Sequence, residues 1–314
     1  MTSVREVGGL GLYLRVAIEE GVIPGPRLYP AGGVLSTTGG HADVHAMPVD
    51  WVMAPHSAGF GVLCDGVAEC LKAVRMQLRG GAVVIKVCAS GGVMSEVDDP
   101  THQQFSDEEL TAIVEEAARA ERIVAAHCHG KAGIMAAIRA GVGSIEHGSY
   151  LDAEAAEAMH DAGIVLVPTR FIIEAALGME KDLPPYAYRK MVSVADHHQQ
   201  ALKTAIATGL TIATGTDIFI SGPMYAQASL EVRHLVDAGM TPLEAVEAAT
   251  ANGPLTLGPQ APRSGQLRAG YDADVIAFDA DPLADLTVWG DPVRVTHVWK
   301  AGVQVKGPSA ERRP

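Results

Sequence analysis

Short apolar runs recur along the chain and alternate with longer stretches in which apolar residues return every three or four positions. The runs are rich in Val, Ile and Ala. Continuous apolar runs of this length, separated by amphipathic helices, are typical of parallel strands in an α/β protein. They cover residues 3–7, 27–33, 83–89, 123–129, 144–148, 164–170 and 210–217. We therefore predict seven parallel strands with helices between them.

The stretches between the runs carry helix start and stop signals. Ser106 followed three residues later by Glu109 forms a capping box, which predicts a helix that runs to about Arg119. Further helices are predicted for the stretch that ends at Gly141, for 151–163, for the 24 residues that follow Pro185, and for 241–253, which begins with Thr241 as cap and Pro242 at the first helical position.

The pattern changes after Pro254, where short apolar segments are joined by Gly and Asp turns. We predict a small β-rich unit over 262–314, with its strands between about 262 and 306. Residues 1–261 then form the larger α/β domain. Its size is close to the roughly 250 residues of an eight-stranded barrel.

Composition excludes several classes of protein. Hydrophobic residues make up 48% of the 314 residues and charged residues 19%, which indicates a folded globular chain. The net charge of −13 argues against nucleic acid or an anionic membrane as partner. No apolar run is long enough to span a bilayer, and the first residues lack the apolar core of a signal peptide. We expect a cytoplasmic protein whose four cysteines are reduced and structural.

Lys86 closes one of the apolar runs, directly after Val83, Val84 and Ile85. An unpaired ammonium is costly to bury, so this lysine needs an explanation. It can reach the rim and form a structural salt bridge, or act as a neutral amine that forms a Schiff base. It can also react with carbon dioxide to give a carbamate that bridges two metal ions.

Three further runs end in residues that bind metals. His127 and His129 are two positions apart, so a strand turns both imidazoles toward the same side. His147 closes the next run, and Asp217 closes the last. An isolated Asp at a strand end is often a turn residue, but the carboxyl ends of parallel strands meet at one edge. The four runs therefore predict a metal site at this edge.

The chain resembles the metal-dependent amidohydrolase superfamily, and more closely the branch of imidazolonepropionase-related proteins and Xaa-Pro dipeptidases. The resemblance covers nearly the whole chain. Its carriers are GGVLSTTGGHAD (32–43), CDGVAECLKAVRMQLRGGAVVIKVCASGG (64–92), FSDEELTAIVEEA (105–117), AAHCHG (125–130), AGVGSIEHG (140–148), ATGTD (213–217), AGMTPLEAVEAATANGPLTLG (238–258) and GQLRAGYDADVIAFDADPL (265–283).

The resemblance implies a fold and a set of roles. The fold is a (β/α)8 TIM-like barrel, here without its first strand, and the C-terminal unit is the remnant of a composite β-sandwich. Lys86 would be the carboxylated, metal-bridging lysine, and His127 and His147 the ligands of the second metal. Asp217 would touch the first metal and act as general base. His129 would face the substrate.

The implied reaction is hydrolysis of the C–N bond of a small amide or dipeptide-like substrate by a metal-activated water. One or two divalent ions would bind, with zinc as the default for His and carboxylate ligands. His41 lies in a loop that the family places over the active site, although a loop histidine can equally bond to backbone. Arg170, predicted to end its strand, can bind a substrate carboxylate or form a rim salt bridge. The oligomeric state stays open, and a homo-oligomer is one outcome.

One feature of the family is absent from this chain. The family carries HxH on barrel strand one, whereas this chain opens at a segment that resembles strand two, and no HxH precedes it. We hypothesise that Met1 is a misassigned start or that the chain is a fragment. Seven strands would leave two sheet edges to be covered. Two other functions therefore stay open, namely a catalytically impaired fold and a Schiff-base lyase that uses Lys86.

Overall fold

The computed structural model describes residues 1–52, 61–218 and 222–308. Its strands are β1 Ser3–Glu6, β2 Arg27–Pro30, β3 Val34–Ser36, β4 Gly61–Leu63, β5 Ile85–Cys88, β6 Val124–Cys128, β7 Ser144–His147, β8 Val165–Val167, β9 Val275–Phe278, β10 Val295–Lys300 and β11 Val303–Lys306. Its α-helices are α1 Gly11–Glu19, α2 Val49–Val52, α3 Gly66–Gly80, α4 Asp107–Arg119, α5 Lys131–Ala140, α6 Ala153–Ala162, α7 Arg170–Leu177, α8 Pro185–Thr208, α9 Leu230–Ala238 and α10 Pro242–Ala249. Short 3-10 helices cover Gly222–Gln227, Gly253–Gln260 and Leu286–Val288.

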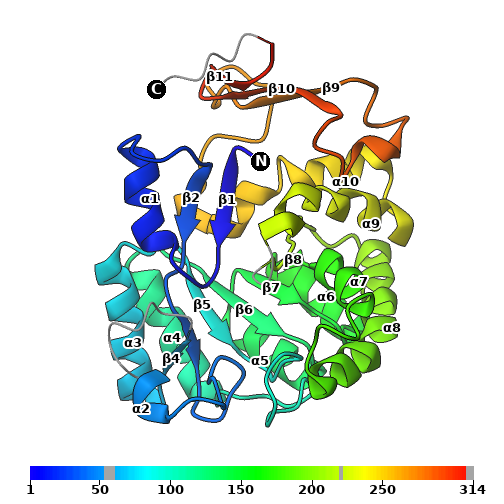
Figure 1. Ribbon diagram of the computed structural model, residues 1–314. Helices are drawn as coiled ribbons and strands as arrows, with labels where there is room; N and C mark the ends of the chain where they lie inside the picture. The colour runs from blue at the N-terminus through cyan, green and yellow to red at the C-terminus, as the bar shows by residue number, and fades with distance from the viewer. Residues whose placement is uncertain (53–60, 219–221, 309–314) are drawn as a thin grey trace.

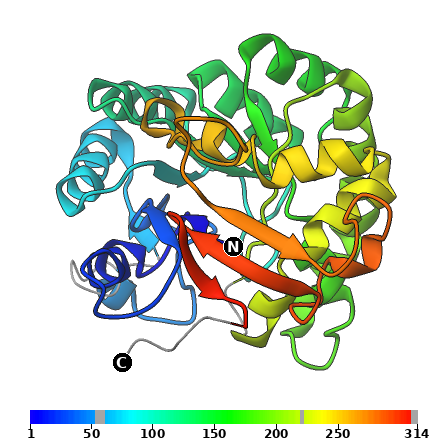
Figure 2. The same cartoon turned by 90° about the horizontal axis from the view of Figure 1, so that it is seen from above.

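The central sheet is parallel, with the strand order β4-β3-β5-β6-β7-β8 (Figure 1). β1 pairs with β2 in the same parallel sense, and the amide of Val83 donates to the carbonyl of Pro30 at 2.9 Å. This bond joins β2 to the segment that leads into β5. The α-helices lie outside these strands, as seen from above in Figure 2. The predicted α/β fold is therefore confirmed.

The main hydrophobic core lies between the sheet and its helices. Its fully buried side chains include Leu35, Ile85 and Ile145 from strands and Ile113 and Ile134 from helices. Short apolar strands buried on both faces need this cover, which explains why their sequences do not alternate with polar residues.

The predicted helices are confirmed, and their ends follow the expected chemistry. Ser106 and Glu109 form both bonds of the capping box of α4, and Thr241 caps α10 in the same way. Helices α5, α6 and α8 each end at a glycine in the left-handed conformation. No helix of the described residues is long and apolar enough to cross a bilayer.

Three strand predictions need correction. The run 27–33 contains β2, and β3 follows it from Val34 onward, whereas β4 was not predicted. The run 164–170 forms a strand only over Val165–Val167, because α7 begins at Arg170. The run 210–217 forms no strand and has a single parallel bridge, from Ile212 to Leu166.

The segment after Ile212 leaves the sheet because its backbone finds another partner. The amide of Thr214 donates to the carbonyl of Ala248 at 3.0 Å, and Asp217 has a left-handed φ of 51°. Among the described residues, no ladder joins this segment to β1. The sheet is open there, and closure of a barrel is not observed.

The C-terminal residues form the predicted β-rich unit, which is an antiparallel sheet with the order β11-β10-β9. Arg27 at the start of β2 forms an ion pair with Asp274 at 2.5 Å, and Lys300 Nζ donates to the carbonyl of Gly25 at 2.6 Å. The small sheet therefore lies against the starts of the parallel strands, opposite their carboxyl ends (Figure 1). The domain boundary at 261/262 stays a prediction, and residues 309–314 lie outside the described part.

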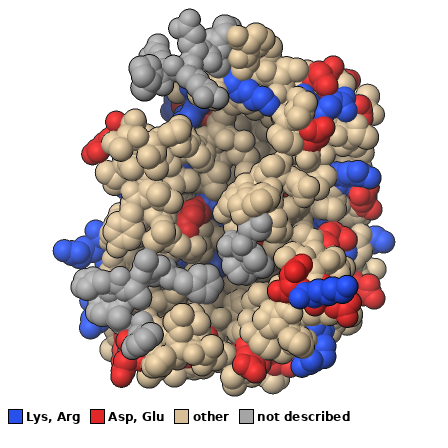
Figure 3. Space-filling model, viewed as in Figure 1, with Lys and Arg blue, Asp and Glu red and all other residues tan. Residues whose placement is uncertain are grey.

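Charged side chains are interspersed on the face drawn in Figure 3. Lys and Arg alternate there with Asp and Glu, mostly around the margin, and do not gather into one basic surface. Mixed charge of this kind is typical of a solvated surface.

A buried ion pair crosses the interior from β1 to β7, which are not neighbours in the sheet. Arg5 Nη2 lies 2.6 Å from Glu146 Oε2, and its Nη1 donates to Ser144 Oγ at 2.9 Å. Ser144 in turn donates to Glu146 Oε1 at 2.6 Å. Both charged side chains are nearly buried, with exposures of 11% and 4%. The pair connects β1, which belongs to the two-stranded sheet, to β7 of the six-stranded sheet.

Arg5→Met should lower the free energy of unfolding by about 3–5 kcal/mol, because it leaves the Glu146 carboxylate buried without a counter-ion. Urea unfolding measures the change. Arg139→Met is the matched control, since the Arg139–Asp107 pair is half exposed and should contribute at most about 1 kcal/mol. The double variant Arg5→Met/Glu146→Gln should recover much of the loss. Equal effects of Arg5→Met and Arg139→Met would contradict a structural role for the buried pair.

Candidate metal centre

Three of the predicted residues lie on adjacent strands, two of them at or near a carboxyl end, whereas Lys86 is the second residue of its strand and not the last as predicted. His127 is in β6, His147 is the last residue of β7, and Lys86 is in β5. The register pairs Cys88 with His127 and Cys128 with His147, so the strands end together. Their shared edge brings the side chains into one region, as the sequence predicts.

His127, His129 and His147 form a compact cluster. One nitrogen from each of the three rings lies within 4.8 Å of the others. The ring centroids are 4.6–4.9 Å apart, and all three side chains are buried. His129, which the resemblance assigns to the substrate, is therefore also within reach of a common ion.

Each imidazole has one ring nitrogen bonded to a neighbouring oxygen. His127 Nε2 lies 3.1 Å from the carbonyl oxygen of Gly91. A carbonyl only accepts, so His127 carries its proton on Nε2 and presents the lone pair of Nδ1. His129 Nδ1 lies 2.7 Å from Ser149 Oγ, and His147 Nδ1 lies 2.6 Å from Thr169 Oγ1. Such partners orient metal-binding imidazoles.

Burial lowers the pKa of all three imidazoles well below the ordinary value, and the nearby His41 and Lys86 lower it further. The rings are therefore neutral at pH 7, which is the form that binds metals.

Lys86 and Asp217 complete the set of candidate ligands. The Lys86 side chain is buried, and no salt bridge to it is found in the described part of the chain. Burial raises the pKa of Asp217 to about 6, an increase that the charge of Lys86 opposes. Three neutral imidazoles fit a divalent cation, and Lys86 would join them only as a carbamate. Among the described residues, the Asp217 carboxylate is not part of the group of ligand atoms that lie within 4.8 Å of one another.

The backbone is strained at three positions around the cluster. His147, Thr169 and Asp217 have left-handed φ angles of 71°, 53° and 51°. Non-glycine residues in this region cost on the order of 1–3 kcal/mol each and occur most often at functional sites.

His41 lies against the cluster from the loop after β3. Its ring stacks on His127 with centroids 4.3 Å apart, and its Nδ1 lies 2.7 Å from Ser95 Oγ. Burial lowers its pKa to about 4. The predicted loop histidine therefore bonds to a side chain rather than to backbone, beside a candidate ligand.

Arg170 lies apart from this arrangement. Its guanidinium bonds to Glu174 Oε1 at 2.5 Å and to the carbonyl of Ala195 at 2.9 Å, and it lies near His198 Nδ1. The side chain is buried at the start of α7, where these donors already have partners. Its role in substrate binding stays a prediction.

Comparison with known proteins connects this geometry to a family. The model of the Amidohydrolase family matches residues 1–305. The chain belongs to the amidohydrolase family. It is 51% identical over 319 residues to ochratoxinase of Aspergillus niger, with 98% of this chain and 66% of that protein aligned. It thus spans just under two thirds of that relative's length.

Solved structures of the family match in three dimensions. The crystal structure of A. niger ochratoxinase gives a TM-score of 0.91 at 50% identity, covering 98% of this chain and 72% of that one. A prolidase complexed with N-methylphosphonate-L-proline gives 0.91 at 34% identity, with coverages of 98% and 76%. A Xaa-Pro dipeptidase with methionine bound in its active site gives 0.88 at 34% identity, with coverages of 98% and 75%. The chain lies in the ochratoxinase and Xaa-Pro dipeptidase branch of the amidohydrolases.

Several residues at this amidohydrolase site were not predicted. They are the oxygens that hold the imidazoles, from Gly91, Ser95, Ser149 and Thr169, and the Arg5–Glu146 pair beneath them. Arg5 and Glu146 had a visible signal, because each is a charged residue inside a predicted strand run. Loop hydroxyls and carbonyls have none.

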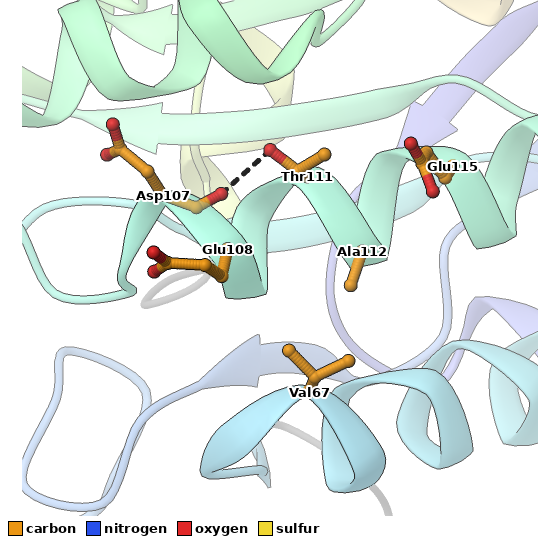
Figure 4. A pocket seen from close by; sticks show the side chains of 6 residues that line it. All are labelled: Val67, Asp107, Glu108, Thr111, Ala112 and Glu115. Carbon is orange, nitrogen blue, oxygen red and sulfur yellow. Dashed lines mark hydrogen bonds between the residues drawn. The ribbon is translucent and has the colours of Figure 1, made fainter.

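A second concave region lies on the outside of the fold, between α3 and α4 (Figure 4). The groove measures about 380 Å³ and is lined by Val67, Asp107, Glu108, Thr111, Ala112 and Glu115. Thr111 Oγ1 donates to the carbonyl of Asp107 at 2.8 Å, and the Asp107 carboxylate pairs with Arg139. The residues that line the groove include three acidic side chains and no histidine, so the groove is not part of the metal centre.

Thr169 links the cluster to two helices. It is the N-cap of α7, but its hydroxyl bonds to His147, and no side chain of its own caps the helix. Glu231 of α9 accepts instead from the amides of Arg170 at 3.0 Å and Phe171 at 2.6 Å. Burial raises the pKa of Glu231 to about 8, although these amides and the Arg170 charge oppose the increase.

Glu231→Gln should flatten the pH dependence of stability. The folded pKa of Glu231 lies above the unfolded value, so its contribution is complete below the unfolded pKa and is lost as the pH rises toward about 8. Between the unfolded pKa and about pH 8, the free energy of unfolding of the wild-type protein should fall, relative to that of the variant, by up to about 1.4 kcal/mol per pH unit. Urea unfolding of both proteins at pH 5, 6, 7 and 8 measures the difference. Parallel curves would show that Glu231 is ionised throughout.

Proposed function

We propose that this chain is a metal-dependent hydrolase that cleaves the C–N amide bond of a small molecule. The observation that carries the proposal is the buried group of three neutral imidazoles, which presents its nitrogens within 4.8 Å of one another at the strand ends. Membership of a family whose matched relatives include ochratoxinase, an amide hydrolase, and a Xaa-Pro dipeptidase supports the same chemistry.

Lys86, His127, His147 and Asp217 are the proposed metal-holding residues, and His129 lies close enough to join them. A divalent ion, with zinc as the default, would supply Lewis acidity that lowers the pKa of water and polarises a carbonyl. Lys86 would take part as a carbamate. Its uncharged amine nitrogen bonds to the carbon of carbon dioxide, one proton leaves, and the new anionic oxygens act as ligands.

Asp217 is the proposed general base. Its pKa of about 6 places it close to neutral pH, where a base is still deprotonated and holds a proton readily. The carboxylate would accept the proton of the attacking water and return it to the leaving amine nitrogen.

The proposed substrates are small amides and dipeptide-like molecules. One solved relative contains a proline derivative and another contains methionine, and both ligands resemble one half of such a substrate. His129 and His41 border the cluster, and we propose that they face the substrate. Arg170 would require its bonds to Glu174 and Ala195 to be broken before it could contribute.

Purified chain supplied with zinc and bicarbonate should bind metal, and His147→Ala should reduce the bound metal by at least about tenfold, because one of few ligands is lost. Elemental analysis after desalting measures this. His160→Ala, an exposed histidine on α6, is the matched control and should retain the metal. If the wild-type chain binds no metal under these conditions, the proposal fails. Borohydride trapping of a substrate adduct on Lys86 would then favour the Schiff-base lyase.

Asp217→Asn should lower kcat for a cleaved Xaa-Pro dipeptide or N-acyl amino acid by about 10²–10⁴-fold, because the amide cannot accept the proton. Release of the amino acid measures the rate. Asp161→Asn, which alters an exposed carboxylate, should leave kcat unchanged. An unchanged rate for Asp217→Asn would remove this residue from the role of base.

A further inference from the structure

The segment 91–98, which follows β5, contacts two of the clustered imidazoles. The carbonyl of Gly91 accepts from His127 Nε2 at 3.1 Å. Four residues later, Ser95 Oγ lies 2.7 Å from His41 Nδ1. Because His41 and His127 stack with centroids 4.3 Å apart, one segment holds both members of a stacked pair.

The direction of the proton in each contact follows from the partners. Ser95 Oγ is within short hydrogen-bonding distance of Asp98 Oδ1, and a carboxylate oxygen only accepts. The Ser95 hydroxyl therefore donates to Asp98 and accepts from His41 Nδ1. His41 carries its proton on Nδ1 and His127 carries its proton on Nε2, so the segment selects opposite tautomers in the two rings.

Lys190 of α8 anchors this segment. Its ammonium donates to the carbonyl oxygens of Ser95 at 2.7 Å, Gly92 at 3.3 Å and Asp98, and lies 3.4 Å from Asp98 Oδ1. An ammonium has three N–H donors, and here three backbone carbonyl oxygens accept from them. All three acceptors are more than 90 positions from Lys190 in the sequence. One turn earlier, Tyr186 donates to the carbonyl of Met94 at 3.3 Å.

The backbone of the segment approaches His41 too closely for a side chain. A Cβ at Gly92 would lie 2.0 Å from ring atoms of His41. The amide of Gly92 donates to Asp98 Oδ2 at 2.9 Å, which closes the segment on itself. The turn is therefore shaped around the ring and is held from outside by one lysine.

We propose that Lys190 is a positioning residue that clamps segment 91–98 and thereby fixes the tautomer and orientation of His127 and His41. The proposal rests on the proposed function insofar as His127 is a metal ligand. Loss of the clamp should release the Gly91 carbonyl from His127 and Ser95 from His41. His127 would then present Nδ1 only part of the time.

Lys190→Met tests the clamp, and the metal-free chain is measured first. Two-dimensional ¹H–¹⁵N spectra that correlate the carbon-bound ring protons with the ring nitrogens should show one tautomer each in wild-type protein, Nε2–H for His127 and Nδ1–H for His41. Lys190→Met should average both tautomers and should weaken zinc binding by about 10–100-fold. Lys203→Met makes the same change at an exposed position of the same helix and should alter neither.

The outcomes separate positioning from stability. Lowered stability with unchanged tautomers would overturn the proposal, because a merely structural lysine would do the same. If Lys190→Met does not fold, Ser95→Ala replaces it and should release His41 while His127 keeps Nε2–H. An unchanged His41 would overturn the proposal. Since the tautomers are measured without metal, a chain that binds no zinc would defeat the proposed function and leave this test intact.

Discussion

Three imidazole rings, of His127, His129 and His147, are buried against one another, and the partly exposed ring of His41 stacks on His127. Every polar atom of a buried ring needs a partner. The surrounding loops supply one oxygen to each ring. The Gly91 carbonyl and the Ser95 hydroxyl, which donates to Asp98, decide which nitrogen carries the proton in His127 and in His41, and so which nitrogen remains for an ion or a substrate. The chemistry of the site thus depends on loop backbone and hydroxyl groups as much as on the histidines.

The hydrogen bonds that hold the imidazoles connect the site to helices in distant parts of the fold. The Thr169 hydroxyl bonds to His147, and so it cannot cap α7. Glu231 takes over the capping and connects α9 to the same strand end. Likewise, Lys190 connects α8 to the segment that holds His127 and His41. Glu231 and Lys190 do not contact the imidazoles themselves, and each connects its helix to backbone groups beside a residue that holds an imidazole.

The charged groups of the interior form two sets, the Arg5–Glu146 ion pair and the residues Lys86 and Asp217. Glu146 points toward Arg5, whose charge lowers the pKa of this carboxyl below its usual value even though burial raises it. Because Arg5 satisfies Glu146, this carboxylate is not held by a bond to Lys86. Neither Lys86 nor Asp217 forms an ion pair with Glu146 in the described part of the chain. In Asp217 the effect of burial exceeds the opposing charge of Lys86, and the pKa rises.

The sequence by itself determined the helices α4, α5, α6, α8 and α10, the parallel strands β1, β2, β5, β6, β7 and β8, and the placement of Lys86, His127 and His147 on three adjacent strands. These features follow from local patterns: apolar runs, capping boxes, terminal glycines, and the rule that parallel strands end together. Only the tertiary structure decided that His129 joins the cluster, that Arg170 is held by Glu174 and Ala195, and that 210–217 leaves the sheet. The physical reason is that the deciding bonds join residues far apart in sequence. His147 and Thr169 are 22 positions apart, and Lys190 and Gly92 are 98 apart, so packing, and not local propensity, selects these partners.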